Sequence, residues 1–203
     1  RPRCYGRDDP RGGGRDRGGG PGGDPGAEQG PAEGLGRRRG VGGGTHQHAD
    51  FISGRRELAS EGAIILAPAA SRLEAPHQAL DHGDELDLGG LTLQALGTPG
   101  HTPEHLAYLL RDGSRPLALF SGGALIPGGA ARTDLISPDQ TEHLARALYR
   151  SVRQHLAGLP DDLAIYPTHG AGSFCSAGTG GLRTTTVGQE RQVNPIFTVP
   201  DED

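Results

Sequence analysis

The chain has 203 residues, of which 36 are glycine and 16 are proline, and its formal net charge is −5. This length allows one domain with its own hydrophobic core, or one domain and a tail. The acidic balance and the 4% content of aromatic residues argue against a nucleic-acid-binding protein.

No membrane span or targeting signal is recognisable in the sequence. No run approaches the ~18 apolar residues of a spanning helix, and the pattern of a secretory signal is missing. One of the two cysteines, Cys4, lies near the start of the chain and the other, Cys175, near its end. This argues against a disulfide framework, so we expect a cytoplasmic protein without membrane contact.

Residues 1–44 form a segment rich in glycine and arginine. It holds 17 glycines and nine arginines, but only Tyr5, Leu35 and Val41 as sizeable apolar side chains. Such a composition buries too little apolar surface to offset the entropy lost on ordering the chain. We therefore expect disorder in residues 1–44 and a folded domain in residues 45–203.

The domain begins with a short helix and continues with strands. The helix is expected at Glu57–Ser60, after the turn at Ser53 and Gly54. Strands are marked by apolar runs or by alternation of apolar and polar residues between turn residues. They are expected at residues 63–68, 85–96 (a hairpin around two glycines), 106–110, 117–121 and 163–170.

One helix is well specified by its ends. Ser137 is a plausible N-cap, Pro138 suits the first helical position, and Gln140 would complete a capping box. Gly158 and Pro160 would end the helix. Apolar residues repeat every four positions between these ends, at Leu144, Leu148, Val152 and Leu156. Together the elements predict an α/β domain.

Histidines stand at the ends of several predicted strands. In "THQHADF", His46 and His48 are two residues apart, so in an extended backbone their side chains point to the same side, with Asp50 one step further. His101 follows the turn residues Pro99 and Gly100, and His169 ends the last strand.

These five residues predict a nitrogen-rich metal site with carboxylate support, suited to zinc or non-haem iron. His105, close to His101, stays ambiguous. The remaining histidines lack such a context and are expected to face solvent; they are His77, His82, His143 and His155.

Several motifs resemble the metallo-β-lactamase-fold superfamily, and within it the branch of persulfide dioxygenases and glyoxalase II, especially bacterial proteins fused to rhodanese domains. The resemblance covers residues 45–195 and implies an αββα sandwich with a metal site at one edge of two sheets. The segment before His46 does not match, so the sandwich is expected to be incomplete at its N-terminal side. The motifs are "THQHADFISGRREL", "GTPGHTPEHLAYLL", "LFSGGAL", "ARTDL" and "YPTHGAGSFC".

The resemblance also implies roles for individual residues. His46 and His101 match the two histidines that hold the single iron of persulfide dioxygenases. His48, Asp50 and His169 match positions that complete a two-metal site in the hydrolases and lie in or near the iron pocket of the dioxygenases. By this resemblance all five are metal-site residues, and Asp50 and His169 also take part in catalysis.

Two positions depart from the family pattern. Phe51 replaces a histidine ligand of the second metal, which favours a mononuclear centre. Gly123 replaces an aspartate that is a metal ligand throughout the branch, and glycine offers no donor. A set of His46, His48 and His101 could then substitute for two histidines and a carboxylate.

The resulting functional hypothesis is a persulfide dioxygenase that uses Fe(II) and O₂ on a thiol-carried persulfide. A zinc-dependent hydrolase acting on a small thioester is the alternative, because zinc lowers the pKa of its bound water. A third reading is a degenerate domain without catalysis. Related proteins continue beyond the position of "DED", so a rhodanese partner domain absent from this chain is also an open alternative.

Overall fold

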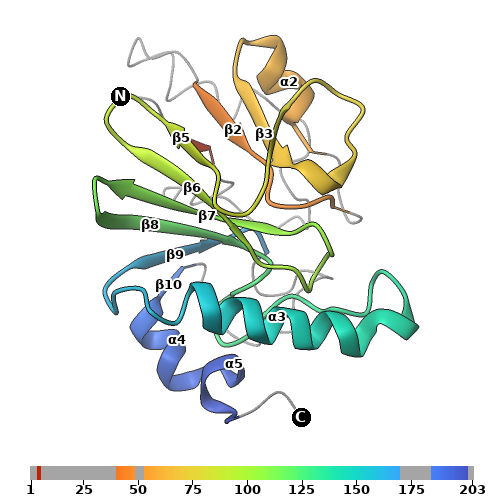
Figure 1. Cartoon of the computed structure of the whole chain (residues 1–203), viewed down its shortest axis with the longest axis vertical. Coiled ribbons are helices and arrows are strands. Elements are labelled where there is room, and N and C mark those ends of the chain that lie inside the picture. The colour runs from red at the N-terminus through yellow and green to blue at the C-terminus, as the bar shows by residue number, and fades with distance from the viewer. Residues whose placement is uncertain (1–3, 6–39, 49–52, 170–183, 201–203) are drawn as a thin grey trace, which may run out of the picture.

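The computed structural model describes residues 4–5, 40–48, 53–169 and 184–200. Two β-sheets lie face to face in the middle of the molecule, with the helix at Arg55–Ser60 above the first sheet and the helices within residues 141–198 below the second (Figure 1). The predicted α/β sandwich with an αββα arrangement is therefore confirmed. In the described part of the chain, no helix has both the length and the apolar character needed to cross a bilayer.

The first sheet is parallel and small. It has the order β1-β2-β3-β4, and its strands are β1 (Cys4–Tyr5), β2 (Val41–Gly43), β3 (Ile64–Pro68) and β4 (Gln78–Leu80). Helix α2 (Arg55–Ser60) connects β2 to β3 and packs against β3. A crossover of this kind is what parallel neighbours require.

The folded part starts earlier than the sequence predicts. Val41 pairs with Ile64 across the sheet and is buried, so disorder does not extend to residues 41–43. The prediction failed here because β2 is held by pairing with β3, which a local composition cannot reveal. Residues 1–3 and 6–39 of the predicted disordered segment lie outside the described residues.

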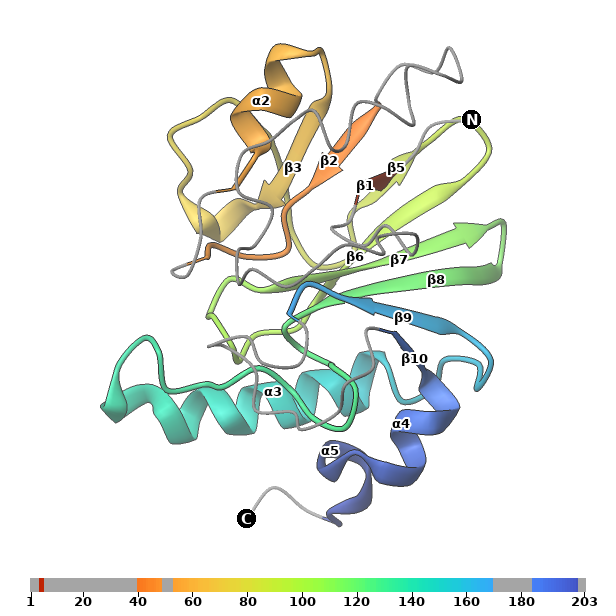
Figure 2. The same ribbon diagram turned by 180° about the vertical axis from the view of Figure 1, so that it is seen from behind.

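The second sheet has six strands in the order β10-β9-β8-β7-β6-β5. They are β5 (Glu85–Asp87), β6 (Thr92–Gly97), β7 (Leu106–Asp112), β8 (Arg115–Gly122), β9 (Ala164–Pro167) and β10 (Thr185–Thr186). Neighbours are antiparallel except β8 and β9, which are parallel. Helix α3 (Thr141–His155) forms the crossover between those two (Figure 2).

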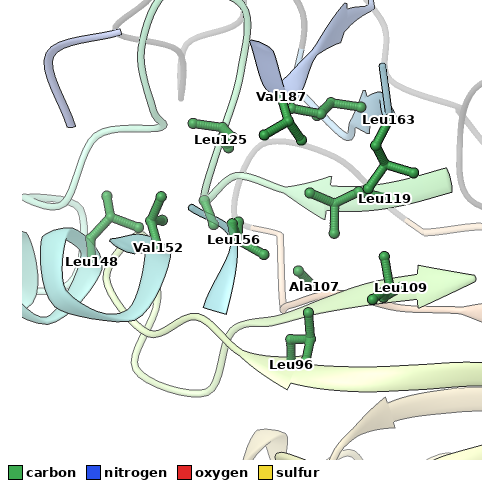
Figure 3. Close-up of a cluster of buried hydrophobic side chains, with 12 residues drawn as sticks. Leu96, Ala107, Leu109, Leu119, Leu125, Leu148, Val152, Leu156, Leu163 and Val187 are labelled. Atoms are coloured by element: carbon green, nitrogen blue, oxygen red, sulfur yellow. The ribbon is translucent and has the colours of Figure 1, made fainter. Parts of the chain in front are cut away.

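Strand β7 shows why the sheets form two cores. Leu106 and Tyr108 join a cluster with residues of the first sheet, whereas Ala107 and Leu109 join a cluster with the helices. Successive side chains of a strand point to opposite faces, so an apolar run buries both faces. Figure 3 shows the helix-side cluster, in which Leu148 and Val152 of α3 face the sheet.

Helix α3 (Thr141–His155) follows a 3-10 turn at Pro138–Gln140. The buried face predicted for it is confirmed by Leu144, Leu148 and Val152. The predicted capping box is wrong in detail, because the side chain of Ser137 accepts from the N–H of Asp139 rather than from that of Gln140. The 3-10 geometry of the first turn brings the earlier N–H into reach.

Two C-terminal helices were not predicted. They are α4 (Val187–Val193) and α5 (Pro195–Thr198). A signal for α4 exists in the sequence, because Thr186 and Gln189 form a capping box at its start.

Candidate metal centre

Four segments of the chain meet at one edge of the second sheet. Strand β7 runs antiparallel to both β6 and β8, and β8 runs parallel to β9, so the C-terminal ends of β6, β8 and β9 lie together. The segment after β2 joins them, because the N–H of Leu106 donates to the carbonyl of Thr45 at 2.9 Å. Five histidines occupy this edge: His46, His48, His101, His105 and His169.

One close pair of ring nitrogens joins residues that are 123 positions apart. Nε2 of His46 lies 3.0 Å from Nε2 of His169, and each side chain is 2% exposed. Without an ion, one of these nitrogens must donate a hydrogen to the other. With an ion, both can offer a lone pair, since nitrogen ligands at about 2.1 Å from a tetrahedral metal lie about 3.4 Å apart. The spacing fits a shared ion.

His48 completes a group of three. One ring nitrogen from each of His46, His48 and His169 lies within 4.8 Å of the others, and the rings of His46 and His48 are 4.1 Å apart. Three imidazoles that converge on one point can hold a divalent transition metal, with further positions left for a substrate. The donor chemistry of the described residues therefore fits a metal ion.

His101 lies beside this group with a fixed ring orientation. Its ring is 4.8 Å from that of His46 and 5.0 Å from that of His169. Nδ1 donates a hydrogen bond to the carbonyl of Arg132 at 2.7 Å. Metal-binding histidines commonly make such a bond, which leaves Nε2 with the lone pair.

Gly100 explains the tight turn before His101. Its φ is +153°, a conformation that favours glycine, and an added Cβ would lie 2.3 Å from Cβ of Leu148. The turn therefore rests directly on helix α3. A side chain at this position would push His101 away from the other histidines.

His105 is a structural residue by its bonding. Its side chain is 1% exposed, Nδ1 lies 2.8 Å from Oγ1 of Thr98, and Nε2 accepts from the N–H of Gly123 at 2.8 Å. An acceptor at Nε2 places the ring hydrogen on Nδ1, so both nitrogens are occupied in the neutral form. The ambiguity of the sequence is thereby resolved toward a role in holding the β8 loop.

The turn at the end of β8 leaves no room for a side chain at Gly122 or at Gly123. Gly122 has a φ of +61°, and a Cβ there would lie 2.3 Å from Nε2 of His105. At Gly123, a Cβ would lie 2.8 Å from Cδ2 of His101 and 2.9 Å from Cβ of Ala131. The ring of His101 and the methyl group of Ala131 thus crowd the space next to the position where the family pattern has an aspartate.

Burial keeps the central imidazoles neutral. Desolvation lowers the pKa of His46 well below its usual value, and the neighbouring histidines lower it further. The pKa of His105 is lowered well below its usual value for the same two reasons, with burial the larger. Neutral imidazole is the form that binds metals, so the protein prepares His46 for this role.

Of the five predicted site residues, the structure brings four to one place. These are His46, His48, His101 and His169, with the first, second and fourth converging most closely. Asp50 lies outside the described residues, as does Phe51. The metal and catalytic roles of all five stay predictions.

Comparison with known proteins identifies the architecture. A crystal structure of a metallo-β-lactamase from Staphylococcus aureus matches with a TM-score of 0.80 and 33% sequence identity, over 90% of this chain and 56% of that one. The chain has a metallo-β-lactamase-like fold. No protein-family model matches the sequence.

Two kinds of enzyme with this fold are similar in sequence. A hydroxyacylglutathione hydrolase of Pseudomonas putida is 37% identical over 126 residues, which are 62% of this chain and 45% of the relative. The mitochondrial persulfide dioxygenase ETHE1 of Homo sapiens is 34% identical over 165 residues, which are 78% of this chain and 57% of the relative. The chain thus spans about half the length of the curated relatives that it matches.

The metallo-β-lactamase-like fold accounts for the position of the histidines. In this chain they lie on loops at one edge of the paired sheets, where rigid strand ends fix the loops. A rhodanese partner domain stays a prediction from the resemblance.

Proposed function

We propose that this chain is the metal-binding part of a mononuclear enzyme that oxidises a thiol-carried persulfide with O₂. The observation that carries the proposal is the convergence of His46, His48 and His169, with the buried Nε2 atoms of His46 and His169 3.0 Å apart. A bound ion would use the lone pairs of these crowded imidazoles.

The ion would be held by His46, His48 and His169. His101 would be a further ligand through the lone pair of its Nε2. Bound Fe(II) would supply open coordination positions for the persulfide sulfur and for O₂. For His46 to offer Nε2, its Nδ1 must carry the hydrogen and donate it to Oγ1 of Thr45, which lies at 2.8 Å. The Arg132 carbonyl fixes His101 in the same way.

The reaction must balance in atoms and electrons. One persulfide, one O₂ and one water would give one thiol, one sulfite and two protons. The outer sulfur is cleaved from the thiol sulfur and loses four electrons, and O₂ gains them. Burial lowers the pKa of His46 and His105, so these two side chains would not readily accept either proton.

Two features support oxidation over hydrolysis. Phe51 stands where a histidine ligand of a second metal is expected, so one ion is favoured. The match to the persulfide dioxygenase of Homo sapiens extends over 165 residues, compared with 126 for the hydrolase of Pseudomonas putida.

A zinc-dependent thioester hydrolase is the second candidate. The available ligand atoms support this candidate. Gly123 offers no carboxylate, and three histidines with one open position are a known catalytic zinc arrangement. In that case the ion would lower the pKa of a bound water.

One experiment separates these candidates. Purified protein is analysed for iron and zinc, and O₂ uptake with glutathione persulfide is compared with hydrolysis of a hydroxyacylglutathione thioester. We expect iron and O₂ uptake with equimolar sulfite. Zinc and thioester cleavage would favour the second candidate, and failure to bind either metal would indicate a domain without catalysis.

A further inference from the structure

Glu190 is a buried carboxylate that binds the loop after β8 to helix α4. Its side chain is 1% exposed, and within the described ranges no cationic side chain pairs with it. Oε2 accepts from the N–H of Gly128 at 3.0 Å and from Nδ2 of Asn194 at 2.7 Å. Oε1 accepts from Oγ1 of Thr185 at 2.8 Å. Three donors thus offset the desolvation of the charge.

Asn194 extends this contact to the other side of the turn. It is fully buried, and Nδ2 also donates to the carbonyl of Gly129 at 2.8 Å. The turn itself is closed by two backbone hydrogen bonds of 3.0 Å between Ile126 and Gly129. Glu190 and Asn194 therefore bind both the N–H and the carbonyl side of one tight turn.

The same turn leads directly to the metal centre. Beyond it, the N–H of Ala131 donates to the carbonyl of Gly123 at 2.8 Å. The next carbonyl, that of Arg132, accepts the hydrogen bond from Nδ1 of His101. Two contacts therefore fix the position of the Arg132 carbonyl. One is the hydrogen bond between Ala131 and Gly123 within the loop, and the other is the hydrogen bond from Gly128 to Glu190 at the turn.

We infer that Glu190, together with Asn194, is a positioning residue for the metal centre: it fixes the loop whose Arg132 carbonyl selects the ring tautomer of His101. Stability alone does not require a carboxylate here, because replacing buried partners by apolar groups of the same shape can be nearly neutral. Directed hydrogen bonds, in contrast, specify where the loop lies. The expected effect on metal affinity rests on the proposed function, whereas the expected effect on the His101 tautomer does not.

That first measurement is the tautomer of His101 in metal-free protein, read from proton–nitrogen NMR correlations of the imidazole rings. Glu190→Met removes both carboxylate oxygens at a similar side-chain length, so the N–H of Gly128 and Nδ2 of Asn194 lose their shared acceptor. Asn194→Asp removes the donor to Gly129 and adds a second carboxylate beside Glu190. Thr185→Val is the matched control, because it removes a hydrogen bond to Glu190 that does not involve the loop.

We expect the Nδ1–H form of His101 to dominate in the wild type and in Thr185→Val, and to lose population in the other two variants. Affinity for Fe(II) or Zn(II) should fall about 10-fold or more in those two variants alone. A folded Glu190→Met protein with the wild-type tautomer and affinity would overturn the inference, as would an equal change in Thr185→Val. If Glu190→Met does not fold, Asn194→Asp decides in the same way. A wild type that binds no metal removes the proposed function, while the tautomer comparison still tests the inference.

Discussion

Nε2 of His105 accepts a hydrogen bond of 2.8 Å from the main-chain N–H of Gly123. This bond joins the start of β7 to the loop after β8 across a fully buried contact. Gly123 stands where the family pattern has a metal-binding aspartate. Its partner His105 uses the lone pair of Nε2 for this hydrogen bond, so that lone pair is not available to a metal. Five histidines near one point therefore do not mean five ligands.

The first prediction concerns the central ligand. His46→Ala should abolish binding of Fe(II) and Zn(II), because Nε2 of His46 lies 3.0 Å from Nε2 of His169, where a shared ion would bind. Metal content after dialysis, measured by elemental analysis, checks this. His143→Ala, which changes an exposed histidine of α3, should keep the wild-type content. Equal metal content in both variants would place the site elsewhere.

The second prediction concerns the turn before His101. Gly100→Ala should destabilise the protein by about 1–3 kcal/mol or more, because the new methyl group collides with Leu148 of α3. Gly158→Ala has open space around it and no positive φ, so it should be neutral or slightly stabilising. Urea unfolding of the metal-free proteins measures both, and similar losses would contradict the packing argument.

The third prediction concerns pH. In the folded protein the pKa values of His46 and His105 lie below their unfolded value of about 6.5. The unfolded chain then binds more protons as the pH falls, so the stability is fully present above about pH 6.5 and declines below it.

Each group contributes a slope of up to about 1.4 kcal/mol per pH unit below pH 6.5. His105→Gln, which keeps an acceptor for Gly123 but cannot titrate, should reduce this slope in the metal-free protein. Thermal unfolding is measured between pH 5 and 8 in steps of about 0.5 pH unit, which resolves the difference in slope. A slope that is unchanged in the variant would show that His105 is not among the groups responsible.

The fourth prediction concerns Gly123. Any side chain here must displace His101 or Ala131, so both Gly123→Ala and Gly123→Asp should lower the stability of the metal-free protein. Only the aspartate adds a donor, so Gly123→Asp should bind Fe(II) more tightly than Gly123→Ala. Calorimetric titration of both variants measures this. Equal affinities would mean that the carboxylate cannot reach the ion in this loop.

The sequence by itself determined several of the elements and predicted a metal site. The apolar run of β7, the alternation in β5 and β6 and the four-residue repeat of α3 are local patterns, and the structure has each of them. The pairing of His46 with His48 in one motif already predicted a metal site, because two residues at this spacing share a side in an extended backbone.

The tertiary structure decided which histidines meet and which are occupied. His105 was ambiguous in the sequence; the structure shows that it is used by Thr98 and Gly123, whereas His169 faces His46. The contacts between these residues span up to 123 positions of sequence. Such contacts depend on strand order and on the register between β6, β7, β8 and β9, which only the packing of the sheets fixes.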